Sequence, residues 1–303
     1  MVGWGAPVGM SSLPEVIAVF GPTASGKSTV AEAVADRLET EVVSADALQV
    51  YRGLPILTNQ PEQPTRLVAI RSLADEMSVA DYAKLAHAAI DELVESSGVA
   101  VVAGGTGLYL RAALVDMRVP PAPRKGARGR WETAYDADPA VAHARLEKID
   151  PTAAASVHVN DRRRVVRALE LAEVGASLVP ERELLWSTEM RRPTIVFGLV
   201  VPDETLESRI RLRTEQMFAR GVVQEVRRAR EERISRTAEQ ALGLADLVEC
   251  SQDEAYKRIL VKTRRYAAYQ RKWMRRIPGI VMIEADRPPT EVADAILEVA
   301  RAR

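Results

Sequence analysis

The chain of 303 residues has very little metal-binding or disulfide chemistry to offer. Cys250 is its only cysteine, which excludes an internal disulfide and any zinc site built on several thiolates. Its three histidines, His87, His143 and His158, are scattered and lack the paired spacing of zinc hydrolases. We therefore expect neither a structural nor a catalytic zinc.

The sequence also lacks an excess of either charge and any long apolar run. Lys+Arg and Asp+Glu both number 42, so a surface for a polyanion has to be local. No segment approaches the roughly 18 unbroken apolar residues of a membrane helix. The opening "MVGWGAPVGMSSLPE" has neither the basic start nor the apolar run of a signal peptide, and Met10 is an alternative start. We expect a cytoplasmic protein with no membrane partner.

Short apolar runs alternate with helical patterns in the first and last thirds of the chain. The runs that we predict to be strands are 15–20, 40–46, 98–105, 193–201 and 279–286. Helical spacing in 28–38 and 78–95 separates the first three, and Ser78 is a suitable N-cap. Such alternation predicts a parallel sheet covered by helices on both faces.

The strand pattern stops between residues 116 and 192. This stretch begins with the basic, Pro- and Gly-punctuated "RVPPAPRKGARGR" and then reads as helices. We predict an α/β fold with a P-loop NTPase-like parallel sheet formed by 14–115 and 193–303. A helical insertion domain, 116–192, interrupts it.

A phosphate-binding loop follows the first predicted strand. The octapeptide "GPTASGKS" (21–28) satisfies the pattern G-x-x-x-x-G-K-[ST], with a strand before it and a helix after it. Gly21 and Gly26 allow backbone N–H groups to surround an anion at a helix N-terminus. Lys27 would reach phosphate oxygens and Ser28 would ligate Mg²⁺. The motif predicts polyphosphate binding but does not identify the reaction.

Two further sequences lie at predicted strand ends, where ligands bind in open α/β sheets. Asp46 ends the second strand and has three open roles: it holds Mg²⁺ through water, acts as a general base, or caps the next turn. "GGTGLY" (104–109) ends the third strand. Its glycines either keep the backbone close to a ligand or form an ordinary glycine turn.

Basic residues gather in three segments. The helical stretch 256–276 has nine Lys and Arg residues, no acid and an apolar-aromatic stripe that includes Tyr266. It is either a packing helix with a solvated charged face or a polyanion surface, and we favour the second interpretation. "NDRRRVVRALE" (160–170) adds four arginines, while Arg209 and Arg213 share one helix face as either a phosphate fork or an exposed pair.

These segments together resemble tRNA dimethylallyltransferases, also called tRNA isopentenyltransferases. The resemblance runs from about Val16 to Trp273 and includes "GPTASGKS", "SADALQVYRG", "GGTGLYLRAAL", "NDRRRVVRALE", "RTEQMFARGVVQEV" and "TRRYAAYQRKWMRR", in this order. It implies transfer of a dimethylallyl group from its diphosphate to N6 of the adenosine beside the anticodon. The implied partners are dimethylallyl diphosphate, the tRNA anticodon stem-loop and Mg²⁺, acting with a monomeric enzyme.

The resemblance also implies residue roles. Asp46 is the general base, Thr106 lines the reaction channel, and Arg213 lies beside the diphosphate. Substrate diphosphate is bound by Gly21, Pro22, Thr23, Ala24, Ser25, Gly26, Lys27, Ser28 and Thr29, with Ser28 on the metal. Contacts to tRNA come from Gln49, which reads the target base, and from Tyr51, Arg164, Arg167, Arg264, Arg265, Gln270 and Arg271. The helical insertion surrounds the anticodon stem-loop.

The sequence departs from the family pattern in places. "LPILTNQP" (54–61) replaces a Gly-Thr-Ala-Lys-Pro stretch, so Asn59 or Gln60 stands for a lysine, and "ALGLADLVE" (241–249) is also atypical. These segments are expected to contact tRNA, and they therefore bear on tRNA choice more than on reaction type. The open alternatives are a P-loop small-molecule kinase, an adenylate isopentenyltransferase acting on free nucleotide, and a non-catalytic RNA-binding protein.

Overall fold

The chain divides into two compact units in a computed structural model that describes residues 13–117, 123–179 and 184–303. The first unit comprises Met1–Asp116 and Leu185–Arg303, and the second is Met117–Leu184. The predicted insertion ended at 192, but 185–192 belong to the first unit. Two arginines of this stretch contact the first unit: Arg191 and Arg192 bind Asp91 with N–O distances of 2.5 and 2.6 Å, and Arg192 also binds Glu15.

Six parallel strands form one sheet in the first unit, in the order β3-β2-β4-β1-β5-β6. The strands are β1 Val16–Phe20, β2 Val42–Ser44, β3 Thr65–Arg66, β4 Ala100–Gly104, β5 Thr194–Val200 and β6 Val281–Glu284. The predicted parallel α/β architecture is confirmed, although β3 was not predicted. Because every strand runs the same way, the carboxyl ends of β1, β2 and β4 meet at one edge.

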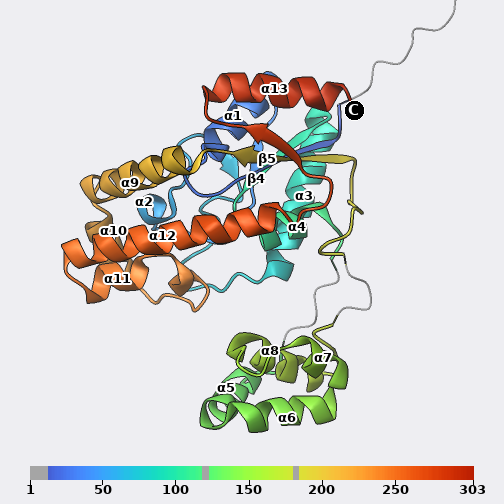
Figure 1. Cartoon of the computed structure of the whole chain (residues 1–303), viewed down its shortest axis with the longest axis vertical. Coiled ribbons are helices and arrows are strands. Elements are labelled where there is room, and N and C mark those ends of the chain that lie inside the picture. Colours follow the sequence, from blue (N-terminus) through green and yellow to red (C-terminus); the bar gives the residue numbers. More distant parts are fainter. Residues whose placement is uncertain (1–12, 118–122, 180–183) are drawn as a thin grey trace, which may run out of the picture. The chain divides into compact units, whose positions relative to one another are not determined.

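The first unit places helices on both faces of this sheet (Figure 1). They are α1 Lys27–Arg37, α2 Pro55–Thr58, α3 Val79–Ser97, α4 Gly107–Leu114, α9 Asp203–Ala219, α10 Val222–Ala229, α11 Leu244–Glu249, α12 Gln252–Met274 and α13 Pro289–Arg301, with a 3-10 turn at Ala238–Gln240. The predicted cap of α3 is present, since the Ser78 hydroxyl accepts a hydrogen bond from the Asp81 amide. In the described part of the chain, no helix has the length and apolar character that crossing a bilayer requires.

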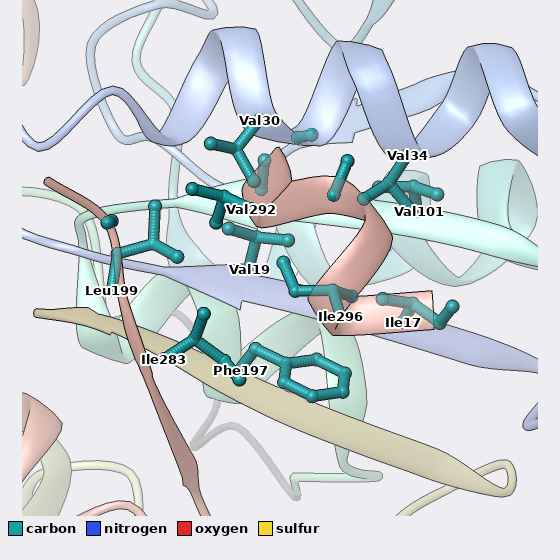
Figure 2. Packing of buried hydrophobic residues seen from close by; sticks show 14 of the residues in the cluster. Ile17, Val19, Val30, Val34, Val101, Phe197, Leu199, Ile283, Val292 and Ile296 are labelled. Atoms are coloured by element: carbon teal, nitrogen blue, oxygen red, sulfur yellow. The ribbon is translucent and has the colours of Figure 1, made fainter. Parts of the chain in front are cut away.

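A continuous apolar core joins α1 and α13 to one face of the sheet. Figure 2 shows Ile17 and Val19 of β1 in one cluster with Val34 of α1 and Ile296 of α13. All four side chains are almost completely buried. Burying each of them contributes about 1.5–3 kcal/mol, so this core fixes α1 and the loop that precedes it.

The second unit has its own small core. Its helices are α5 Ala127–Ala137, α6 Pro139–Ile149, α7 Pro151–Ser156 and α8 Arg162–Ala172. Leu146, Val165 and Leu169 are fully buried in the cluster that holds these helices together. Asp138 and Asp161 cap α6 and α8 through their side chains, which explains where two of these helices begin.

The glycines that follow β4 make room for α12. A Cβ on Gly105 would lie 2.2 Å from the Gln270 side-chain nitrogen, and one on Gly107 would lie 2.2 Å from the Trp273 ring. Neither glycine has the positive φ that would itself require glycine. Their immediate constraint is therefore the close approach of α12, an explanation that we had not considered for "GGTGLY".

We expect Gly107→Ala to lower the stability of the first unit, because the added methyl group overlaps the half-buried ring of Trp273. Overpacking of this kind costs about 1–3 kcal/mol, which thermal unfolding would detect as a lower Tm. Gly129→Ala is the control: its position in α5 has open space around it, so its Tm should stay the same or rise. An unchanged Tm for Gly107→Ala would show that Trp273 moves away freely.

Candidate active site

The candidate site is built from three chain segments that leave the same edge of the sheet. The phosphate loop, residues 21–26, joins β1 to α1. Asp46 follows β2, and Thr106 follows β4 as the residue before α4. In the loop, Gly26 and Ala24 have left-handed φ angles of 85° and 64°, which turn the chain tightly into the first turn of α1.

Polar groups of the phosphate loop point into protein rather than solvent. Thr23 and Ser25 are 7% and 1% exposed. The Ser25 hydroxyl is buried and has no hydrogen-bond partner among the described residues. Buried hydroxyls are nearly always satisfied, so this one, beside a helix N-terminus, fits an anion that would supply the missing acceptor.

Two cationic side chains, Lys27 and Arg213, interact electrostatically with the Asp46 carboxylate at this loop. Burial lowers the pKa of Lys27 to about 8, with Asp46 opposing the shift and Arg213 adding to it. Burial also lowers the pKa of Arg213, again against the effect of Asp46. Arg213 donates a hydrogen bond of 2.5 Å to the Thr23 hydroxyl. The charge balance of these three groups is positive, which suits a diphosphate.

Arg209 and Arg213, four residues apart on α9, have different partners. Arg213 reaches the phosphate loop, whereas Arg209 donates to Asp286 at 3.1 Å. The predicted pair is therefore not a phosphate fork. Of these two arginines, Arg213 is the one that contributes its charge to the site.

Asp46 caps a turn with one of its two carboxylate oxygens. Oδ1 accepts the backbone N–H of Leu48 at 2.9 Å and that of Gln49 at 3.4 Å. Among the described residues no hydrogen bond to Oδ2 is present. Capping thus occupies Oδ1 and leaves Oδ2 for a substrate proton or a metal-bound water, so the cap does not exclude the other two roles.

Gln270 of α12 ties the phosphate loop to the end of β4. Its side-chain carbonyl accepts the Thr23 N–H at 2.7 Å, and its amide donates to the Gly105 carbonyl at 2.9 Å. The residue is 2% exposed. We predicted a tRNA contact for Gln270, but in the structure its side chain is buried and links the phosphate loop to Gly105.

The atypical segment 54–61 supports Gln49 from within the protein. The Gln49 side chain accepts from the Ser44 hydroxyl at 2.9 Å and donates to the Asn59 carbonyl at 2.8 Å. Gln60 donates to the Tyr51 carbonyl at 2.7 Å. Tyr51 itself is 1% exposed, with its hydroxyl 2.5 Å from that of Thr237, so its position does not suit the tRNA contact that we predicted.

Known proteins resemble this chain over nearly its whole length. The model of the IPP transferase family matches residues 49–277. The chain belongs to this family. It is 38% identical to the tRNA dimethylallyltransferase of Kineococcus radiotolerans, over 96% of this chain and 98% of that protein.

Two solved structures agree with this membership. The tRNA isopentenylpyrophosphate transferase of Bacillus halodurans is 28% identical, with a TM-score of 0.68 over 95% of this chain and 97% of its own. A eukaryotic dimethylallyltransferase acting on tRNA is 25% identical, with a TM-score of 0.73 over 89% of this chain and 73% of its own.

The basic residues of 256–276 form more ion pairs than the sequence indicated. Acids from elsewhere pair with four of the nine in 256–276. The pairs are Arg258–Glu254, Lys262–Asp246, Arg264–Glu207 and Arg271–Asp203. Four of the nine charges are therefore compensated, three of them by acids of α9 and α11, which are distant in the sequence.

Two of the arginines predicted to contact tRNA face solvent. Arg265 of α12 and Arg164 of α8 are exposed. Neither has an ion pair within the described ranges. Arg167, by contrast, is half-buried and donates to Glu170 at 3.1 Å. Arg164 and Arg265 thus have the exposure that a polyanion contact needs.

Residues at the loop fit a phosphate-bound Mg²⁺ rather than a metal caged by protein. The described residues contain no group of three or more His, Cys, Asp or Glu side chains that could hold a metal. Ser28 lies at the start of α1, next to Lys27. Mg²⁺ is commonly held by one or two protein oxygens, substrate phosphates and water, and Ser28 would supply such an oxygen.

The lowered pKa of Lys27 predicts how diphosphate binding depends on pH. Below about pH 8 the amine is charged, and a bound alkyl diphosphate would raise its pKa further. Between the two pKa values binding takes up a proton, so affinity should fall as pH rises, by up to about tenfold per unit. Calorimetric titrations from neutral to alkaline pH would measure this dependence.

Lys27→Arg is the matched control for that series, because arginine stays charged throughout. Its affinity for the same alkyl diphosphate should be nearly independent of pH. Parallel pH profiles for the two proteins would assign the dependence to a group other than Lys27.

Proposed function

We propose that the chain transfers a dimethylallyl group from dimethylallyl diphosphate to N6 of the adenosine adjacent to the anticodon in tRNA, releasing diphosphate. The observation that carries this proposal is the convergence of the phosphate loop, Asp46 and Thr106 at one edge of the sheet. The names of the relatives and the eukaryotic neighbour acting on tRNA support the same substrates.

Asp46 is the base in this proposal. An exocyclic adenine amine is a poor nucleophile because its lone pair is delocalised into the ring. As the C–N bond forms, the amine proton passes to the Asp46 carboxylate, whose Oδ1 is held by the Leu48 amide. The cap fixes the orientation of the carboxylate before the substrate arrives.

The phosphate loop stabilises the leaving group. The allylic C–O bond breaks and its electron pair goes to the diphosphate, which gains negative charge. Loop N–H groups, Lys27 and Arg213 lie where they can stabilise that charge. Mg²⁺ bound to the diphosphate and Ser28 would neutralise part of it.

For tRNA we propose contacts from both units. Arg265 belongs to the first unit and Arg164 to the second, and both side chains are exposed. The helices of 117–184 supply further surface for the anticodon stem-loop. We also propose that the enzyme is monomeric and cytoplasmic.

We expect Asp46→Asn to lower the transfer rate by about 10²–10⁴-fold, because the amide has almost no basicity. Asn keeps the oxygen that accepts the Leu48 N–H, so the turn and the tRNA affinity should be preserved. Single-turnover labelling of tRNA from dimethylallyl diphosphate measures the rate. Asp36→Asn, at an exposed position of α1, is the control for loss of one carboxylate.

The same assay across a Mg²⁺ series distinguishes the roles of Asp46. Near-normal activity of Asp46→Asn would show that Asp46 only caps the turn and is neither the base nor a metal ligand. Recovery at high Mg²⁺ would assign Asp46 to the metal instead. A loss that is independent of Mg²⁺ supports the base.

We expect tRNA binding to weaken steeply with salt, because each phosphate contact adds about one unit to the log-log salt slope. Arg265→Gln should lower that slope by about one unit. Arg258→Gln should leave it unchanged, since Arg258 is equally on α12 but pairs with Glu254. Equal rates of transfer to tRNA and to free AMP, with no salt dependence, would contradict the proposed acceptor.

A further inference from the structure

Tyr266 brings a hydroxyl from α12 to the end of β4. Its oxygen lies 3.3 Å from the Thr106 hydroxyl. It precedes Gln270 by one helical turn, so both side chains face the strand ends. The sequence places Tyr266 in an apolar-aromatic stripe, and its four-residue spacing from Gln270 is the signal for its position.

Tyr266 differs from the two other tyrosines of α12. The Tyr256 hydroxyl donates to Glu215 at 3.4 Å on the protein surface, and Tyr269 is 55% exposed. Tyr266 is half-buried, and its hydroxyl meets a residue of the candidate site. Packing alone would require the ring but would not require a hydroxyl directed at Thr106.

The Tyr266 hydroxyl remains protonated over the physiological range. Burial, with a smaller contribution from Asp46, raises the pKa of Tyr266 to about 12. The group can therefore donate a hydrogen bond and does not act as a base. Thr106 occupies the N-cap of α4 without making a side-chain capping bond, so its hydroxyl is available to accept from Tyr266.

We propose that Tyr266 is a positioning residue for group transfer, acting through its hydrogen bond to Thr106. A diphosphate offers only acceptor oxygens. If Tyr266 donates to the Thr106 oxygen, the Thr106 proton is free to point at the departing diphosphate. No proton is transferred in this arrangement. The Tyr266–Thr106 and Thr106–diphosphate hydrogen bonds strengthen each other as negative charge develops on the diphosphate. The inference rests on the proposed function, since Thr106 takes its role from it.

Tyr266→Phe is the direct test, because it removes the hydroxyl and keeps the ring. One neutral hydrogen bond corresponds to a loss of about 3- to 10-fold in the single-turnover rate. The dissociation constant for tRNA and the Tm should stay near the wild-type values. Tyr269→Phe, three residues away on the same helix, should transfer at the normal rate.

A double-mutant cycle with Thr106→Val separates positioning from packing. Once Thr106 has lost its hydroxyl, Tyr266→Phe should have no further effect. Thr106→Ser retains the hydroxyl and should restore the sensitivity to Tyr266→Phe. Single-turnover rates at saturating tRNA are the readout for each variant, and melting curves confirm that each is folded.

Three outcomes would overturn the inference. The first is a normal single-turnover rate for Tyr266→Phe. The second is that Tyr266→Phe lowers the rate by the same factor in the Thr106→Val background as in the wild type. The third is a lower rate that is explained entirely by a lower Tm. If the wild-type enzyme transfers no label to tRNA, the proposed function fails first, and the role of Tyr266 fails with it. An active wild type with an insensitive Tyr266→Phe rejects the inference alone.

Discussion

The two hydrogen bonds of Gln270 are the contacts on which the site depends. They join the Thr23 amide to the Gly105 carbonyl through a single buried side chain. The phosphate loop belongs to one strand–helix unit and Gly105 to another, while Gln270 comes from a helix about 165 residues further along the chain. Together with the packing of α1 on the sheet and the Arg213–Thr23 hydrogen bond, these contacts hold the phosphate loop in place.

Charge is arranged so that the site stays positive in a chain with no net charge. On α12, acids from neighbouring helices neutralise residues such as Lys262 and Arg264. At the loop, Asp46 is the described carboxylate that opposes the shifts of both Lys27 and Arg213 in pKa. The paired arginines hold helices together, and the less compensated cations lie where an anionic substrate would bind.

The sequence predicted features whose determinants are local. The phosphate loop, the alternation of strands and helices, and the Ser78 cap are each encoded within a few residues. Features that depend on distant partners were missed or misjudged: Gln270 and the ion pairs of α12 involve segments far apart in the sequence. Strand β3 was not predicted because a strand of two residues is too short to show a hydrophobic periodicity. The roles of Asp46 and Thr106 came from family resemblance, since spacing alone cannot distinguish a base from a cap.

Leu114 and Arg191 are joined by a backbone hydrogen bond of 2.9 Å, although the whole second unit lies between them in sequence. The chain therefore leaves the first unit and returns to it at almost the same place. A segment whose ends already touch can be lengthened, shortened or exchanged at little cost in loop-closure entropy. The sheet can thus tolerate variation in the inserted helices without changes in its own packing, which allows the second unit to diverge faster than the first.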